Sequence, residues 1–372
     1  MSNIAFLWDN FGPTHIDECE ALAAALPDGA KLTGIELFSK SGTYGWGRWQ
    51  GTGFEQVTLF DGSEQQVRPG TLQIARKIVQ TVRARKIKHV FFCHYQEPYI
   101  LLSAWALRLL GCRLYVLSDS KFDDYPRHLR RELGKSFFMT PYHGALTASL
   151  RCKDYIRFLG VNPDRIRRGY YSISMDRVRA AAGAEPAPGG LPHGERHFLS
   201  IARLVPKKNH VMLVDAYARY KATATSPRKL ILCGSGPLEA DIRERIAAHG
   251  LEDWIEVRGN VLPADVATEL GRALCLLLPS IEEQFGIVVL EAQALGLPVI
   301  VSDNVGARDV QVRTGVNGFV VEPDNPEGMA YFMRSLSDDE TLWRAMATEA
   351  GKFSQKGDIP VFVDAALELI RS

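Results

Sequence analysis

Glu283 and Glu291 are the residues of this chain whose type and spacing most clearly suggest chemistry. Glu283 lies in a polar loop, and Glu291 lies inside the apolar stretch that follows Phe285 and Gly286. If that stretch is a helix, the Glu291 carboxylate points back toward the loop, because helical side chains lean toward the N-terminus. Two carboxylates can hold the hydroxyl groups of a sugar, and the first N–H groups of a helix can bind a phosphate. The alternative is a buried glutamate bonded to nearby backbone.

Cations and glycines follow two earlier apolar runs of strand length. Arg203, Lys207 and Lys208 follow the run HFLSIA, and arginine and lysine are the side chains that neutralise a diphosphate. Gly234 and Gly236 follow the run LILC, where glycine lets the backbone approach a ligand closely. Taken singly, these features also fit a solvated basic loop and a tight turn. The turn is not G-x-G-x-x-G, which weakens the case for an NAD-binding dehydrogenase.

The elements that must position these residues alternate along the chain. Apolar runs of strand length are followed by amphipathic stretches of helix length, which is typical of parallel β-α-β units. Such sheets bind ligands beyond the carboxyl ends of their strands, where the residues above lie. A break in composition at residues 180–195, rich in proline, glycine and alanine, predicts a linker. The sequence therefore predicts a first domain at 1–180, a linker at 181–195 and a second domain at 196–355.

Composition excludes several classes of function. The formal net charge of +1 over 372 residues argues against a nucleic-acid partner bound through bulk charge. No apolar run reaches the ~18–20 residues that span a bilayer, and the first residues do not resemble a signal peptide. The six cysteines are scattered without a C-x-x-C pair, which argues against a zinc site or a disulfide framework. We therefore expect a cytoplasmic protein.

Together, the motifs of the second half resemble those of family 4 glycosyltransferases with the GT-B fold. Glu283 to Glu291 is similar to the family's E-x7-E segment, and Arg203 with Lys208 is similar to its R-x4-K. The other similar segments are the G-x-G-P turn at Gly234-Ser-Gly236-Pro237, the base-side loop at Arg258-Gly259-Asn260-Val261, and the late turn at Gly315-Val-Asn317-Gly318. These motifs occur in order over residues 197–325, whereas the N-terminal half resembles the family only in layout.

The chain departs from the family pattern at two places. Asn209 stands where a glycine is common, a change that we expect to be harmless. Ala307-Arg308-Asp309 stands where the family usually has a Pro-Glu pair, which leaves a phosphate contact of the Val305-Gly306 loop open.

The resemblance implies an α/β protein with two Rossmann-like parallel-sheet domains facing each other across a cleft. A terminal helix at 356–372 would pack back on the first domain. The implied reaction is retaining transfer of a hexose-type sugar from a nucleoside-diphosphate sugar to a hydroxyl acceptor, such as a glycan, a lipid-linked saccharide or a small molecule. No cofactor or metal is required, because arginine and lysine replace a metal ion at the diphosphate. The alternatives are a nucleotide-sugar epimerase or glycosyl phosphorylase of this fold, or a sugar-nucleotide binding protein without turnover.

The resemblance also implies residue roles. Arg203 and Lys208 would neutralise the leaving diphosphate, Glu291 would hold the ribose and Glu283 the transferred sugar. The expected donor-binding set is Gly12, Arg203, Lys208, Gly234, Gly236, Gly259, Asn260, Val261, Glu283, Phe285, Gly286, Ile287, Val288 and Glu291. The expected catalytic set is Glu283, Asp119, Arg203 and Lys208. Asp119 follows a strand of the first domain and is expected to contact the transferred sugar; the alternative is that it only caps a turn. His94, which follows another strand of that domain, is a weaker candidate for the same role.

Residues Pro126–Met139 form a basic stretch in which Leu129, Leu133 and Phe137 recur at four-residue spacing. One interpretation is a surface that lies on an anionic membrane at the inner face, beside a lipid-linked acceptor. The other is a solvated face with an ordinary buried apolar stripe. The sequence alone favours the second.

Overall fold

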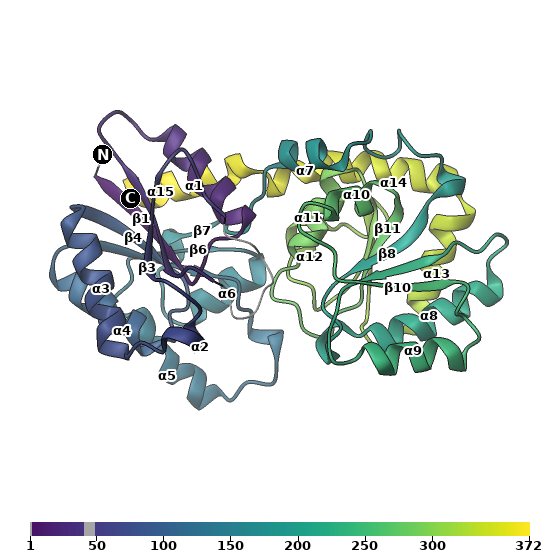
Figure 1. Cartoon of the computed structure of the whole chain (residues 1–372), viewed down its shortest axis with the longest axis horizontal. Coiled ribbons are helices and arrows are strands. Elements are labelled where there is room, and N and C mark those ends of the chain that lie inside the picture. Colours follow the sequence, from purple (N-terminus) through teal and green to yellow (C-terminus); the bar gives the residue numbers. More distant parts are fainter. Residues whose placement is uncertain (1, 41–48) are drawn as a thin grey trace. The chain divides into compact units, whose positions relative to one another are not determined.

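The computed structural model describes residues 2–40 and 49–372, which divide into two compact units. The first unit comprises Met1–Phe122, Pro126–Ile173 and Asp358–Ser372, and the second comprises Asp123–Tyr125 and Ser174–Gly357. Each unit contains one parallel sheet flanked by helices (Figure 1), so the expected α/β class with two parallel-sheet domains is confirmed.

The first unit is built on a seven-stranded sheet with the order β3-β2-β1-β4-β5-β6-β7. Its strands are β1 (Asn3–Trp8), β2 (Leu32–Phe38), β3 (Glu55–Phe60), β4 (Ile87–Phe92), β5 (Arg113–Ser118), β6 (Gly144–Thr147) and β7 (Ile166–Arg168). Its helices are α1 (Pro13–Ala25), α2 (Glu64–Val67), α3 (Thr71–Ala84), α4 (Pro98–Leu109), α5 (Leu129–Met139), α6 (Leu150–Phe158) and α15 (Ile359–Arg371). The central strand β1 is buried on both faces, as parallel sheets between helix layers require.

The second unit is built on a six-stranded sheet with the order β10-β9-β8-β11-β12-β13. Its strands are β8 (His197–Ile201), β9 (Leu230–Cys233), β10 (Ile255–Gly259), β11 (Ala273–Leu278), β12 (Val299–Ser302) and β13 (Gly318–Val321). Its helices are α7 (Met175–Ala182), α8 (His210–Thr223), α9 (Glu239–Ala248), α10 (Val266–Gly271), α11 (Ile287–Ala294), α12 (Arg308–Gln311), α13 (Pro326–Asp338) and α14 (Glu340–Phe353). The strand order reverses between β8 and β11, as it does between β1 and β4, and ligands of such sheets bind at these switch points.

The last helix, α15, belongs to the first unit and packs on α1 (Figure 1). The side chain of Phe362 is buried and its ring lies 5.5 Å from that of Phe6 on β1, measured between centroids. The hydroxyl of Tyr115 on β5 donates a hydrogen bond to the Leu369 carbonyl over 3.0 Å. The apolar face of this helix therefore completes the core of a domain whose other elements end at Ile173.

The segment 181–195, which the sequence predicts as a linker, is packed into the second unit. Ala187 is buried, and its N–H donates to the carbonyl of Leu295 over 2.9 Å. His193 is also buried, with a ring nitrogen 2.9 Å from the Leu336 carbonyl. The chain passes between the units at Ile173 and Ser174 instead. Proline and glycine disfavour long helices and strands, but they do not prevent a segment from docking through backbone hydrogen bonds, so composition alone misplaced this boundary.

Candidate functional site

The loops after β8 and β11 meet at the switch point of the second sheet. The N–H groups of Ile281 and Glu282 both donate to the carbonyl of Lys207, over 2.8 and 3.3 Å. The side chains continue this contact: Lys207 pairs with Glu282 over 3.1 Å, and Lys208 pairs with Glu283. The structure thus joins Lys208 and Glu283, which lie far apart in the sequence, in one ion pair at the edge of the sheet.

The Lys208–Glu283 pair is largely shielded from solvent. The two side chains are 12% and 13% exposed, so each charge fixes the position of the other. An ammonium group has three N–H donors, and therefore Lys208 can hold Glu283 and a phosphate oxygen at the same time. Arg203 lies in the same loop after β8 and is exposed to solvent. The two loops can therefore offer the cations of Arg203 and Lys208 to an anion and the carboxylate of Glu283 to a hydroxyl group.

Asn209 explains why the loop after β8 tolerates a residue other than glycine. Its backbone has a φ of 62°, in the left-handed region, which asparagine enters more readily than most side chains. Its amide donates hydrogen bonds to the carbonyls of Pro279 and Pro323, over 3.2 and 2.7 Å. The asparagine therefore ties together the loops after β8, β11 and β13. The expectation that this departure is harmless agrees with this geometry.

Helix α11 begins directly after the loop that carries Glu283. Gly286 caps it with a φ of 96°, and Phe285 beside it is buried. The N–H groups of Ile287 and Val288 begin the helix, so they have no acceptor within it, and both residues are only half-buried. These N–H groups can donate to an anion, and anion binding at the start of α11 stays a prediction.

Glu291 lies on α11, and its environment is unusual for a carboxylate. Burial raises the pKa of its carboxyl group above the ordinary value, and the charge of Arg177 on α7 partly opposes this effect. The sequence analysis did not identify Arg177, because its proximity depends on how α7 packs against α11. Glu291 is half-buried, so its carboxylate can still accept strong hydrogen bonds from hydroxyl groups that enter the site.

The loop after β12 supports the backbone of Glu283. The N–H of Gly306 donates to the Glu283 carbonyl over 3.2 Å, and the N–H of Ala307 donates to the Phe285 carbonyl over 2.8 Å. A Cβ atom on Gly306 would lie 1.9 Å from the carbonyl oxygen of Gln284, so only glycine fits. These two N–H groups already have protein acceptors. The Val305-Gly306 loop therefore serves here to hold the loop that contains Glu283.

Gly234 and Gly236 form the turn after β9, where close packing requires them. A Cβ atom on Gly234 would lie 1.9 Å from the carbonyl oxygen of Ala202, and one on Gly236 would lie 2.4 Å from that of Leu204. The turn is thus pressed against the loop after β8. This internal packing alone requires glycine at both positions, so the glycines are not evidence that the turn approaches a ligand.

The expected base-side loop begins at Gly259, the last residue of β10. Its φ is 80°, and its carbonyl accepts a hydrogen bond of 2.7 Å from the N–H of Gly234. Asn260 is exposed and Val261 is half-buried. All three lie at the same edge of the sheet as the ion pairs, because β10 is parallel to β9.

In the first unit, Asp119 lies just after β5. Its Oδ2 accepts a hydrogen bond of 3.1 Å from the hydroxyl of Tyr171. Tyr171 has a φ of 65°, which is rare for a bulky side chain, and its N–H donates to Glu18 on α1 over 3.0 Å. Glu18 is fully buried, and burial raises the pKa of its carboxyl group. The sequence analysis missed Tyr171 and Glu18, since neither carries a local motif.

Gly12 and His94 lie near the switch point of the first sheet. Gly12 precedes α1, and its N–H donates to Nδ1 of His15 over 3.1 Å. His94 follows β4, and its Nε2 lies 3.3 Å from Oδ2 of Asp9, which follows β1. The neighbouring Cys93 and the carboxylates of Asp9 and Asp119 raise the pKa of His94 to about 10. The carboxylates of Asp9 and Asp119 thus favour the protonated form of the His94 imidazole at this switch point.

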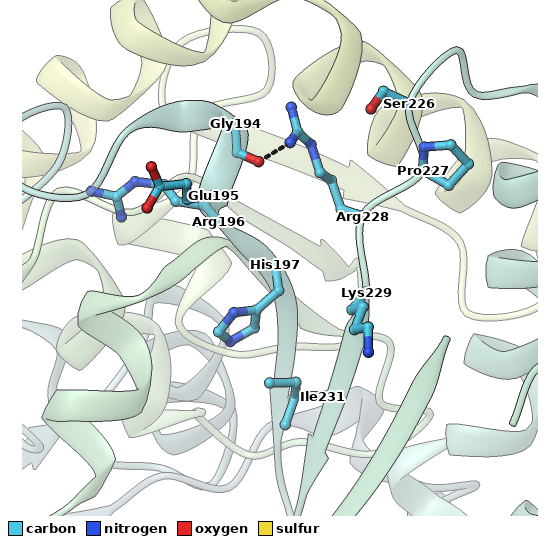
Figure 2. A pocket seen from close by; sticks show the side chains of 9 residues that line it. All are labelled: Gly194, Glu195, Arg196, His197, Ser226, Pro227, Arg228, Lys229 and Ile231. Carbon is cyan, nitrogen blue, oxygen red and sulfur yellow. Dashed lines mark hydrogen bonds between the residues drawn. The ribbon is translucent and has the colours of Figure 1, made fainter. Parts of the chain in front are cut away.

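A cavity of about 400 Å³ lies elsewhere in the second unit, at the amino ends of β8 and β9 (Figure 2). Its lining includes His197, the first residue of β8, and Arg228, which donates to the Gly194 carbonyl. The nine residues drawn around it include none of the expected site residues. This cavity opens at the opposite edge of the sheet from the ion pairs.

Within residues 2–40 and 49–372, no cluster of three or more His, Cys, Asp or Glu is arranged to hold a metal ion. In the same residues no helix combines the length and apolar character needed to cross a bilayer.

Comparisons with known proteins agree with this geometry. Residues 183–353, which contain the ion pairs and α11, match the family "Glycosyl transferases group 1". The chain is 27% identical over 244 residues to a D-inositol 3-phosphate glycosyltransferase of Streptomyces scabiei, a match that covers 63% of this chain and 54% of that protein. The chain spans about half the length of the curated relatives that it matches.

Solved structures match the whole fold. A glycosyltransferase from Rickettsia africae matches with a TM-score of 0.75 at 17% identity, covering 99% of this chain and 97% of that one. Anabaena Alr3699/HepE in complex with UDP matches with a TM-score of 0.73 at 16% identity, covering 100% and 99%. These matches confirm the expected GT-B fold.

Proposed function

We propose that this protein is a retaining glycosyltransferase that moves a hexose-type sugar from a nucleoside-diphosphate sugar to a hydroxyl acceptor, without a metal ion. The observation that carries the proposal is the joining of Lys208 and Glu283 beside the start of α11. The matched family and the named relatives support the same class of reaction. The neighbour solved with UDP makes a uridine donor the first one to test.

The phosphates are the centre of the proposed donor site. Lys208 and Arg203 provide positive charge, and the N–H groups of Ile287 and Val288 provide donors at the positive end of a helix. As the bond to the sugar breaks, negative charge develops on the diphosphate. Cations and N–H groups that are already in place stabilise that charge without reorganising, which is the largest contribution in many enzymes.

The carboxylates complete the donor site. Glu283 is fixed by Lys208 and by the loop after β12, so it can accept hydrogen bonds from hydroxyls of the transferred sugar. Glu291 lies further along α11 and would hold the ribose. In a retaining reaction on one face of the sugar, a phosphate oxygen of the donor accepts the proton of the acceptor hydroxyl. The protein then positions the two substrates and stabilises charge.

The first experiment measures nucleotide binding by calorimetry with UDP, GDP, ADP and CMP. Lys208→Met should weaken binding of the preferred nucleotide about ten- to a hundredfold, because it removes a charge-assisted hydrogen bond. Lys352→Met is the matched control, since Lys352 is an exposed lysine of the same unit that pairs with Glu349 on α14. Equal affinity in the wild type and in Lys208→Met would contradict the proposed phosphate site.

The second experiment separates the possible reactions. A glycosyltransferase releases nucleoside diphosphate in proportion to added hydroxyl acceptor, and its product keeps the anomeric configuration of the donor. An epimerase converts the donor without an acceptor, and a phosphorylase requires inorganic phosphate. A binding protein gives no turnover with any of these. Nuclear magnetic resonance of the anomeric proton distinguishes retention from inversion in the product.

A further inference from the structure

Helix α5 (Leu129–Met139) carries an apolar stripe that faces solvent. Leu129, Leu133 and Phe137 are 58%, 57% and 58% exposed, and their four-residue spacing places them on one face of the helix. The sequence favoured the interpretation in which this stripe is buried. That interpretation is wrong, because the residues buried on α5 are Glu132 and Met139.

The only acid of the stretch 126–139 anchors the helix to the protein. The side chain of Glu132 is 1% exposed and accepts hydrogen bonds from the hydroxyl of Tyr155 and, over 2.9 Å, from Lys135. Arg127 lies 3.4 Å from the same carboxylate and also donates to the Tyr155 hydroxyl over 2.9 Å. The helix is thus turned with its acid inward, which leaves the leucines and the phenylalanine outside.

The exposed surface of α5 is basic as well as apolar. Arg130 is exposed at the edge of the apolar stripe, Arg131 is exposed at the same end of the helix, and His128 is exposed just before it. No carboxylate of the stretch 126–139 shares this surface, since Glu132 is buried. Apolar groups flanked by cations are the combination that inserts into the headgroup region of an anionic bilayer.

We propose that the exposed face of α5, formed by Leu129, Arg130, Leu133 and Phe137, binds an anionic phospholipid surface. Charge complementarity selects this occupant over a second copy of the chain, because two such faces would bring like charges together. The phosphate headgroups instead attract the arginines, while the leucines and Phe137 enter the acyl boundary. The proposal concerns the first unit and does not depend on nucleotide binding in the second.

The test is flotation of the whole chain with phosphatidylcholine vesicles that contain or lack phosphatidylglycerol. We expect binding only when phosphatidylglycerol is present, and weaker binding at high salt. Leu133→Gln combined with Phe137→Gln should reduce the partition coefficient about tenfold or more, because the apolar insertion is lost. Arg130→Gln combined with Arg131→Gln should reduce it by a similar factor.

The matched control is Leu109→Gln, which removes an 84% exposed leucine from α4, another helix of the same unit. This variant should bind vesicles like the wild type. Calorimetry of nucleotide binding on every variant verifies that the second unit is intact, so a failure here is separate from a failure of the proposed function. No binding of the wild type to anionic vesicles would overturn the proposal, as would equal losses in the α5 and Leu109 variants. A dimer in sedimentation that the α5 variants dissolve, without lipid binding, would identify a second copy as the occupant instead.

Discussion

Replacing Glu291 by glutamine separates the stability of the fold from the affinity for nucleotide. The amide has nearly the shape of the carboxylate, so the packing of α11 should persist. What changes is the charge, in a position where burial raises the pKa of the carboxyl group and Arg177 only partly opposes that effect. The native carboxylate is therefore unfavourable for folding, and the glutamine should remove that unfavourable contribution.

The sign of the pH dependence follows from this shift. Because the pKa of Glu291 is higher in the folded than in the unfolded chain, folding takes up a proton between the two values. The free energy of unfolding of the wild type therefore falls as pH rises from the usual value of 4.5 through the folded pKa. The Glu291→Gln protein lacks this contribution, so at about pH 8 its Tm should equal or exceed that of the wild type.

Nucleotide affinity should change in the opposite direction. If Glu291 holds the ribose, the variant loses a charge-assisted hydrogen bond worth ~1.5–3 kcal/mol, which corresponds to about a ten- to 150-fold increase in Kd. Calorimetric titration with UDP and scanning calorimetry at about pH 5 and about pH 8 measure both effects. Glu282→Gln is the matched control, since Glu282 forms a partly exposed pair with Lys207 in the same site and should change stability by at most ~1 kcal/mol. Unchanged Kd in Glu291→Gln would refute the ribose role, and a large fall in Tm would refute the argument from burial.

Three further predictions concern other parts of the molecule. Gly306→Ala should destabilise the protein by ~1–3 kcal/mol in chemical denaturation, because its Cβ would lie 1.9 Å from the carbonyl oxygen of Gln284. Gly351→Ala on α14, which has open space around it, is the control and should stabilise the protein by about 0.5–1 kcal/mol. Tyr171→Phe removes the hydroxyl that donates a hydrogen bond to Asp119, and it should lower kcat about tenfold while the affinity for UDP stays constant. A parallel loss of kcat and UDP affinity would indicate misfolding instead. Turnover should persist in excess EDTA, and activity that is lost and then restored by Mg²⁺ would contradict the metal-independent reaction.

The sequence predicted the arrangement of the second unit well because the topology of a parallel sheet determines where its strands end. Each strand of a parallel sheet ends at the same edge, so residues that follow β8 and β11 must lie near one another wherever they occur in the chain. Lys208 and Glu283 obey this rule, and Gly286 marks the start of α11 where the pattern placed it. The position of Arg177 opposite Glu291 could not be predicted, because no local pattern specifies which helix packs against α11.

Helix α5 illustrates a different limit. Four-residue spacing shows that Leu129, Leu133 and Phe137 share a face, but periodicity does not state whether that face meets the protein or the solvent. The answer depends on Glu132, whose partners Tyr155 and Arg127 lie outside the helix. Similarly, the composition of 181–195 predicts little helix or strand, but it does not show whether the segment packs against a domain.

The position of α15 has a consequence for the order in which the protein folds during synthesis. The first unit lacks this helix until the ribosome has translated the whole of the second unit, from Ser174 to Gly357. At about 5–20 residues per second, that interval lasts on the order of ten to forty seconds. Throughout it, the apolar surfaces of β1 and α1 that receive Phe362 stay uncovered in the nascent chain. The second unit, although it follows in the sequence, therefore has the opportunity to fold to completion before the first unit is complete.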